Sequence, residues 1–382
     1  MGGWIGQNSR VSTPRVSWDQ VLAWRMARQY LETGAEDPVQ VVRRLCGVQA
    51  QVGSAAELAV GVRLSRPGLA EPVRALDNRA LIRTWAMRGT LHLLPADAAG
   101  ALLALMAALK NWERPSWQKT FISAAQMQAL TEVAGRILEE RAVSREELVA
   151  EVLRQTGDRH LAEHLRSGWG VALKPLAWQG LLCQVPADGN RVRFTSPSNW
   201  APGWRHLPPV EEAARIVIPA YLAAYGPASM RAFDQWLSRG TSGRGTLRAW
   251  FDAADDLLAR IDVEGAEAFA RIEDVEEIVR TRPTRTVRLL PAFDQYVLGP
   301  STGDAQVLPP AHRSRVSRTA GWIAPVVVNG GRVTGTWETR NSALEVAMFP
   351  GEALPPGGAL EAEVARLGAL LKRRLSLSLR AV

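Results

Sequence analysis

The chain has 382 residues, enough for two or three domains, and an apolar fraction of 47% with a mean hydropathy near zero is typical of a globular protein. Its two cysteines, Cys46 and Cys183, exclude a disulfide framework and a thiolate metal site, and the first ten residues have no apolar core that would make a signal peptide. The most apolar helix candidate, residues 101–109, is too short to cross a bilayer, so we expect a cytoplasmic protein that does not use a membrane.

The net charge of +8 comes almost entirely from arginine, because only four of the 46 basic residues are lysines. One interpretation is the codon usage of a GC-rich genome, and the other is a polyanionic partner, since guanidinium groups suit phosphates and guanine edges. Residues 280–340 carry nine arginines and three acids, whereas residues 251–277 carry ten acids and two arginines. An evenly solvated surface would not separate its charges in this way, so the pattern favours nucleic acid.

Residues 1–13 are predicted to form a disordered extension, and residues 14–96 a first module. Ser17 and Gln20 form a capping box that opens a first helix, a second helix is predicted over residues 38–45, and Ser54 with Glu57 is predicted to cap a third. Two β-rich runs then flank Arg88-Gly89 as a hairpin. Three helices that end in a hairpin make a winged helix.

A short segment, Gln49-Ala50-Gln51, lies between two of these helices. Gly47 is placed to end the helix before it, so the segment is predicted to be extended. Residues i and i+2 of an extended chain face the same way, and both carboxamides should therefore point to one side of an exposed loop. Paired amides offer hydrogen-bond donors and acceptors without a titrating charge.

The same plan recurs twice. In residues 97–205, Ser144 opens a helix, residues 165–179 are predicted as another, and strands at 181–185 and 191–195 flank the turn Asp188-Gly189-Asn190. In residues 206–283, helices are predicted over 210–224, 227–237 and 246–258, followed by strands at 258–261 and 268–272.

Residues 284–382 are predicted to form a small, basic, β-rich subdomain with a hairpin at 326–333 and a final helix at 360–375. The predicted fold class is therefore α+β, with three tandem winged-helix modules and a C-terminal β-rich subdomain.

Tandem winged helices with basic segments predict binding to duplex DNA, and hence association with the nucleoid. The alternative is that the modules serve only as protein–protein scaffolds, with each basic residue a solvated surface charge. The loop at 299–312 either enters a groove of the DNA or is a plain connector. The candidate DNA-binding residues are Arg83, Arg88, His92, Lys174, Arg244, Arg248, His312, Arg313, Arg315 and Arg318.

One further motif is His160-Leu161-Ala162-Glu163-His164, which matches the His-x-x-Glu-His pattern of a metalloprotease class. No third ligand is evident, and a solvated helix face is the simpler interpretation. The chain also has no Walker loop, dinucleotide fingerprint or Gly-x-Ser-x-Gly, so we expect neither a metal nor a cofactor. Most of the fourteen tryptophans are assigned to packing, with one or two left to stack on a base or ligand.

Three segments together resemble a known family: Gln49-Ala50-Gln51, Arg88-Gly89-Thr90-Leu91-His92, and Leu290-Pro291-Ala292-Phe293-Asp294-Gln295-Tyr296. The chain resembles the winged-helix DNA glycosylases of the AlkZ/YcaQ superfamily over about residues 14–380, and the apolar residue between two glutamines is similar to the AlkZ branch. The YcaQ branch carries Gln-x-Asp at the same place.

The resemblance implies a monofunctional DNA glycosylase that excises N7-alkylguanine and unhooks interstrand crosslinks, as in self-resistance to the antibiotic azinomycin. It also implies a C-shaped monomer that uses no metal, with Gln49 and Gln51 as the catalytic residues. Its partner would be double-stranded DNA that carries alkylated guanine or crosslinks.

This chemistry is consistent with two neutral amides. N7-alkylguanine is cationic and leaves without an acid, so the protein has only to place a water and stabilise an oxocarbenium-like sugar. Flipping a crosslinked nucleotide into a tight pocket is implausible because its other end is bound to the opposite strand, so we expect an open basic groove.

Three alternatives remain open from the residues alone. The chain could be a winged-helix transcription regulator without catalytic activity, or a drug-sequestering protein with clefts lined by tryptophan. The two glutamines could also only cap neighbouring backbone groups.

Overall fold

The computed structural model describes residues 13–66, 68–166, 170–188 and 191–380. All but the last residue of the predicted extension 1–13, and the turn residues Gly189 and Asn190, lie outside the described residues. None of the helices in the described part of the chain has the length and apolarity that crossing a membrane requires.

The architecture is α+β and is dominated by a unit that occurs three times: a helix, a short strand, two helices and a hairpin. Repeat 1 comprises α2 (Pro38–Arg44), β2 (Val48–Gln49), α3 (Gly53–Gly61), α4 (Glu71–Asp77), β3 (Leu81–Trp85) and β4 (Leu91–Pro95). Repeat 2 comprises α7 (Ala124–Glu140), β5 (Val143–Ser144), α8 (Arg145–Thr156), α9 (Arg159–Arg166), β6 (Cys183–Asp188) and β7 (Arg191–Thr195). Repeat 3 comprises α12 (Val210–Tyr225), α13 (Met230–Ser238), α14 (Arg244–Ala253), β8 (Leu258–Val263) and β9 (Ala266–Arg271), and Ala228 bridges Phe269 where the other repeats have a first strand.

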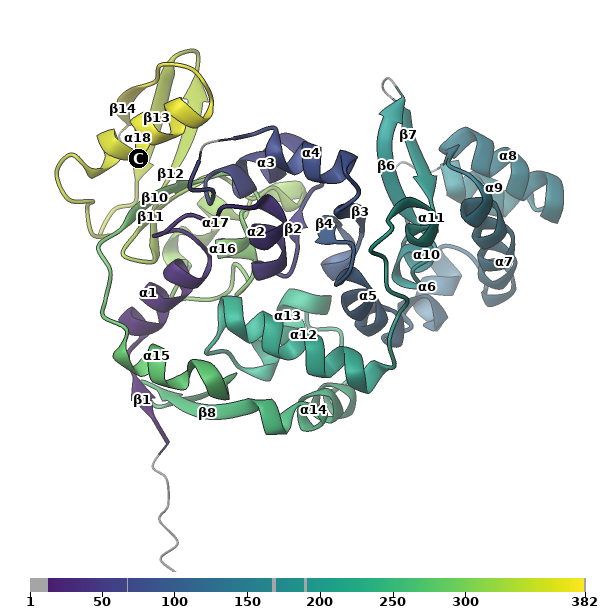
Figure 1. Ribbon diagram of the computed structural model, residues 1–382, viewed down its shortest axis with the longest axis horizontal. Coiled ribbons are helices and arrows are strands. Elements are labelled where there is room, and N and C mark those ends of the chain that lie inside the picture. Colours follow the sequence, from purple (N-terminus) through teal and green to yellow (C-terminus); the bar gives the residue numbers. More distant parts are fainter. Residues whose placement is uncertain (1–12, 67, 167–169, 189–190, 381–382) are drawn as a thin grey trace, which may run out of the picture.

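The other helices and strands before residue 284 connect and surround these repeats. They are β1 (Arg15–Val16), α1 (Trp18–Arg28), α5 (Ala99–Ala108), α6 (Pro115–Thr120), α10 (Lys174–Trp178), α11 (Pro197–Trp200) and α15 (Val275–Arg280). Figure 1 shows repeat 1 near the centre, α7, α8 and α9 of repeat 2 on the right, and α12, α14 and β8 of repeat 3 along the lower edge.

The helix content of repeat 1 differs from the prediction. The capping box of Ser17 and Gln20 is confirmed and opens α1, but α1 packs on repeat 3, where Trp24 shares a core with Ile261, and β1 pairs in parallel with β8. The structure adds α4, which was not predicted. The capping box at Ser54 is wrong, because α3 begins at Gly53 and no side chain caps it.

In repeat 2, the helix predicted over residues 165–179 is wrong. The chain leaves α9 at Arg166, and α10 is a separate helix of five residues that follows Gly170, whose φ of +60° is left-handed. The predicted helix start at Ser144 is confirmed, and there Ser144 forms a capping box with Glu147. Both strands of the hairpin are also confirmed.

A six-stranded sheet joins the first two repeats in the order β2-β4-β3-β6-β7-β5. The junction between β3 and β6 is short: Arg83 pairs with Gln184, and the Thr84 hydroxyl donates to the Leu182 carbonyl at 2.7 Å. The hairpin of repeat 1 therefore lies inside a shared sheet, and β2 forms one of its edges.

The C-terminal part contains a five-stranded sheet in the order β10 (Val287–Leu290), β11 (Val326–Asn329), β12 (Arg332–Arg340), β13 (Ala343–Met348) and β14 (Ser376–Arg380). The helices of this part are α16 (Gln295–Leu298), α17 (Arg313–Val316) and α18 (Ala359–Leu370). The predicted hairpin at 326–333 is confirmed. The final helix ends at Leu370 instead of 375, because the chain turns there to add β14, a strand that was not predicted, in parallel to β13.

Candidate active site

The glutamine pair lies on and next to β2, at the edge of the six-stranded sheet. α2 ends in a Schellman motif in which the Gly47 N–H donates to the Val42 carbonyl at 2.9 Å, with Cys46 at φ +51° and Gly47 at φ +103°. Side chains rarely adopt the φ of Gly47, and a Cβ atom there would lie 2.6 Å from the Leu94 side chain on β4, so backbone and packing both favour glycine. The prediction that Gly47 ends the helix is confirmed.

The backbone of Gln49-Ala50-Gln51 is held on both sides. Gln49 pairs with His92 of β4, and the Ala50 N–H donates to the Leu91 carbonyl at 2.7 Å. The Arg83 Nη2 atom donates to the Ala50 carbonyl at 2.7 Å. The predicted extended conformation is confirmed at Gln49, which lies in β2, whereas Gln51 lies in a bend. The expected exposure holds only for Gln51, because Gln49 is 7% exposed.

Arg88 fixes the carboxamide of Gln49. It lies in the short loop between β3 and β4 with a φ of +57°, a conformation that costs a non-glycine residue about 1–2 kcal/mol. Its Nη2 atom donates to Gln49 Oε1 at 3.2 Å, and its Nη1 atom donates to the carbonyl of Trp236 in α13 at 2.8 Å. One guanidinium thus connects the glutamine of repeat 1 to a helix of repeat 3.

The ring of His92 supports the same guanidinium. His92 Nδ1 lies 2.9 Å from the Thr90 carbonyl and must donate to it, which leaves Nε2 as the acceptor that faces Arg88 Nη2 at 3.4 Å. Burial, and secondarily the charge of Arg88, lowers the pKa of His92 to about 3. The imidazole is therefore neutral at physiological pH.

Gln51 is held more loosely than Gln49. The Leu91 N–H donates to Gln51 Oε1 at 3.4 Å, near the limit of a hydrogen bond, and the side chain is exposed. Within the described chain, the Nε2 atoms of both glutamines have no protein partner. Both amide oxygens thus face donors of the β3–β4 hairpin, and both NH₂ groups stay available.

Cations surround this hairpin. Lys174, at the start of α10, lies beside the hairpin loop, since a Cβ atom built on Gly89 would be 3.7 Å from its Nζ atom. Burial, followed by the charge of Arg239, lowers the pKa of the Lys174 amine. Among the described residues no carboxylate forms an ion pair with Arg83, Arg88, Lys174 or Arg239, and we call these four side chains the hairpin cations. Arg239, at the end of α13, was missed in the sequence because only the fold brings it close.

The other predicted DNA-binding residues lie elsewhere on the surface. Arg244 and Arg248 are exposed on α14. Arg313, Arg315 and Arg318 are exposed on or beside α17, and the described chain offers none of them a carboxylate partner.

The two histidines predicted to bind DNA are both buried. His92 has no exposed surface. His312 is 8% exposed, and its ring stacks on Phe349 with centroids 4.4 Å apart. Both rings are therefore packed largely against the protein, and the DNA contact predicted for them stays a prediction.

The excess of acidic residues in the segment 251–277 is explained by ion pairs within the protein. Acids of residues 251–277 pair with arginines, for example Asp256 with Arg215 and Asp274 with Arg28 and Arg271. In residues 280–340, Arg288 and Arg332 are paired, whereas the arginines around α17 keep their positive charge unmatched among the described residues.

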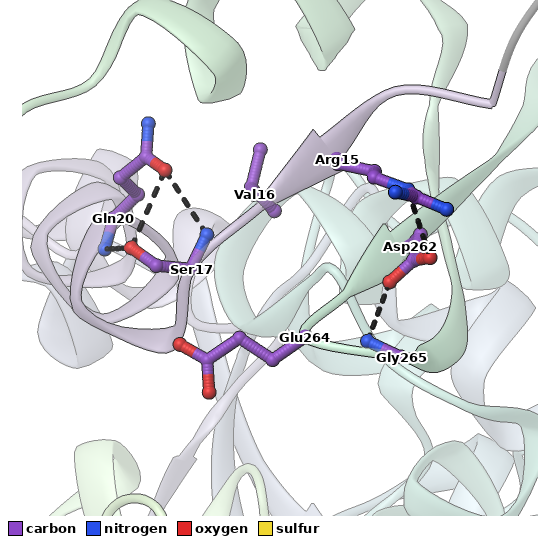
Figure 2. Close-up of a pocket in the computed structure, with 7 residues that line it drawn as sticks. All are labelled: Arg15, Val16, Ser17, Gln20, Asp262, Glu264 and Gly265. Carbon is purple, nitrogen blue, oxygen red and sulfur yellow. Dashed lines mark hydrogen bonds and ion pairs between the residues drawn. The ribbon is translucent and has the colours of Figure 1, made fainter.

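Two other features lie apart from the glutamines. His160 and His164 face each other on α9 with Nε2 atoms 3.2 Å apart, and no group of three or more histidine, cysteine or acidic residues suited to a metal occurs in the described chain. A shallow depression of about 450 Å³ lies between β1 and β8 (Figure 2), where Arg15 pairs with Asp262, and its described lining residues include none of the predicted site residues.

Comparisons with known proteins agree on one family. The model of the family described as "DNA glycosylase AlkZ-like" matches residues 42–370. The interstrand DNA cross-link repair glycosylase of Streptomyces sahachiroi is 47% identical over 356 residues, which cover 92% of this chain and 96% of that protein. The solved structure of the Streptomyces sahachiroi DNA glycosylase AlkZ matches with a TM-score of 0.91 at 45% identity and covers 96% of this chain and 100% of that one.

Proposed function

Because the chain belongs to the AlkZ-like DNA glycosylase family, and is therefore an enzyme that hydrolyses N-glycosyl bonds, we propose that it excises N7-alkylguanine from duplex DNA. The proposal includes guanines joined in interstrand crosslinks, since a 47% identical relative is named as a cross-link repair glycosylase. It further includes action as a monomer without a metal or cofactor, with Gln49 and Gln51 as catalytic residues.

One observation carries the substrate assignment: the side chains that the edge strand presents are neutral amides. An amide neither gives nor takes a proton near neutral pH, so it cannot protonate a departing base. N7-alkylguanine needs no such help, because its positive charge already weakens the bond between N9 and C1′. A water held between the two amides would attack C1′ as the N9–C1′ bond breaks. The base leaves neutral with the bonding electrons, and the surplus proton of the water passes to solvent.

The electrostatics around the glutamines suit the polyanion that must be bound. The hairpin cations form no ion pair with a carboxylate in the described chain, and burial lowers the pKa of Arg83 and of Lys174. Such groups gain stability when a phosphate replaces the missing counterion. We assign Arg83, Lys174 and Arg239 to the backbone that flanks the damaged nucleotide, whereas the guanidinium of Arg88 donates to Gln49 and to the Trp236 carbonyl.

The exposed arginines of α14 and α17 extend the proposed contact with the backbone. Phosphate contacts of this kind set position without sequence readout, which suits an enzyme that meets lesions in any context. A crosslinked guanine stays tethered to the opposite strand, so an edge strand at the surface is better placed to reach it than an enclosed pocket.

A duplex with one N7-methylguanine tests the proposal. Protein and duplex are incubated, and alkali then cleaves the strand at each abasic site. We expect strand breaks at the lesion under single-turnover conditions and none in an undamaged duplex. Breaks no more frequent than without protein would contradict the assignment.

Gln49→Ala and Gln51→Ala test the proposed catalytic residues. We expect each to lower the single-turnover excision rate by about 100-fold, the scale for removing one oriented polar group from a transition state. The dissociation constant for DNA should change little, because neither side chain carries charge. Full rates in both variants would reject the roles given to the glutamines.

A further inference from the structure

We propose that Arg88 is a positioning residue for the reaction: it fixes the orientation of the Gln49 carboxamide and is itself held by His92 and by the Trp236 carbonyl. This inference rests on the proposed function. It gives Arg88 a role through Gln49 in addition to any contact with DNA.

The need for such a residue follows from the symmetry of an amide. The terminal torsion of glutamine is broad and nearly two-fold, so a carboxamide can exchange its oxygen and its NH₂ group by a half turn. The two orientations present opposite hydrogen-bonding groups to a water. A site that depends on one of them must therefore fix it.

Arg88 supplies that constraint at Gln49. A guanidinium has only donors, so the atom 3.2 Å from Arg88 Nη2 must be the amide oxygen. The planar amide then directs its NH₂ group away from Arg88, and within the described chain Nε2 has no protein partner. Because Gln49 is 7% exposed, its surroundings also limit its movement.

The position of Arg88 is fixed in turn from two sides. The Trp236 carbonyl accepts from Nη1 at 2.8 Å, and the unprotonated Nε2 of His92 faces Nη2 at 3.4 Å. The backbone of Arg88 is left-handed, with a φ of +57°, a strained conformation for a residue with a side chain. His92 is opposite Gln49 in the pairing of β2 and β4, so both side chains emerge on the same face of the sheet.

The arrangement gives the two glutamines different roles. Gln49 is fixed and offers N–H donors to the oxygen of a water. Gln51 is exposed and loosely bonded through Leu91, so its Oε1 atom can accept a hydrogen from the same water. The water would then sit between a fixed donor and an adaptable acceptor with a lone pair left for C1′.

A double-mutant cycle with Gln49 tests the inference. Arg88→Met keeps side-chain length and removes all donors. We expect it to lower the single-turnover excision rate on N7-methylguanine by about 10- to 100-fold, the scale of one hydrogen bond to a charged group, with the DNA dissociation constant changed less than about threefold. In the Gln49→Ala background the same change should lower the rate less than about twofold.

Two further variants complete the test. Arg28→Met removes another half-buried arginine that donates to a main-chain carbonyl, that of Ala223, and should leave the rate unchanged. Guanidinium ion added to Arg88→Ala should restore part of the excision rate, which a purely structural role would not allow. If Arg88→Met fails to fold, Arg88→Lys replaces it in the cycle, because a single ammonium nitrogen does not reproduce the two guanidinium nitrogens that reach Trp236 and Gln49 separately.

The outcomes separate the two proposals. Loss of rate in Gln49→Ala, with Arg88→Met either fully active or equally harmful in both backgrounds, would overturn the role of Arg88 and leave the proposed function intact. A large rise in the DNA dissociation constant with an unchanged single-turnover rate would also overturn it, and would make Arg88 a phosphate contact. Full activity of Gln49→Ala would reject the site itself.

Discussion

Gln49 carries no charge at any pH, and its neighbours are arranged to keep the site free of titration as well. The pKa of His92 is lowered to about 3, and burial lowers that of Arg88 only to about 10. Between these values the fixed glutamine, the imidazole and the guanidinium each keep one protonation state. The hydrogen bonds that orient Gln49 should therefore be the same across the physiological range.

His92 makes the stability of the protein depend on pH in a predictable direction. Its pKa is depressed in the folded state, whereas the unfolded chain has the ordinary value near 6.5, so below pH 6.5 the unfolded chain binds a proton that the folded protein does not. The free energy of unfolding therefore falls as pH decreases from 6.5 toward 3, and this one group contributes a loss of about 2 kcal/mol by pH 5.

His92→Gln removes this contribution and retains a neutral acceptor for Arg88. Denaturant unfolding at pH 7 and at pH 5 measures the effect. We expect the variant to lose less unfolding free energy than the parent between the two values. An identical loss of unfolding free energy in both proteins would mean that folding does not lower the pKa of His92.

For single residues, the sequence predicts the local backbone conformation better than it predicts the burial of a side chain. The order of Gly47, Gln49 and Gln51 is enough to predict an extended segment, because a glycine at a helix end is a local signal. The burial of Gln49 is not predictable in the same way. Its partner Arg88 is 39 residues away in the sequence, and Arg88 in turn bonds to Trp236 in another repeat.

Helices and hairpins were predictable from the sequence where their start or turn signals are local. The hairpins, the capping box at Ser17 and the helix start at Ser144 are confirmed because both ends of each signal lie within a few residues. The box at Ser54 is wrong because the helix begins one residue earlier, at Gly53. α4 was missed although Pro72 in its first turn is a recognisable start signal.

A buried ion pair connects repeat 1 to the C-terminal part of the chain. Arg63, just after α3, donates to both carboxylate oxygens of Asp294 at 2.8 and 2.7 Å, and neither side chain is exposed. Asp294 also caps α16 through the Tyr296 N–H. The segment Leu290-Pro291-Ala292-Phe293-Asp294-Gln295-Tyr296 therefore ties the C-terminal part to repeat 1.

Removing one partner should be costly, because it leaves a buried charge without compensation. We expect Asp294→Ala to lower the free energy of unfolding by about 3–5 kcal/mol. The exposed pair of Arg43 and Asp97 is a matched control, with a similar distance of 2.7 Å, and Asp97→Ala should cost less than about 1 kcal/mol. Denaturant unfolding of both variants measures the difference, and equal effects would mean that the buried pair is solvated.

For the whole molecule, the sequence was sufficient to predict the family and the α+β class, and both are confirmed. The repeated helix–hairpin patterns can be recognised in the sequence itself. The shared six-stranded sheet cannot, because it depends on a single paired position between β3 and β6, about one hundred residues apart. The domain boundaries expected from the sequence stay a prediction.

Across the whole molecule, some charged side chains form ion pairs and others do not. The acidic stretch of residues 251–277 is largely matched by arginines, so it is a structural feature of repeat 3. The hairpin cations and the arginines around α17 have no such match among the described residues, and this surplus is what a DNA backbone would compensate.

The central claim is that a site of neutral amides excises only bases that already carry positive charge. Two duplexes of the same sequence test it, one with N7-methylguanine and one with 7-methyl-7-deazaguanine, which keeps the methyl group and the shape but is neutral. Single-turnover excision rates are measured for each at pH 7. We predict excision of the cationic base and a rate at least about 1000-fold lower for the neutral one, since no group supplies the proton that its departure needs. Excision of the neutral base within tenfold of the cationic base would contradict the account, because it would require a general acid at the site.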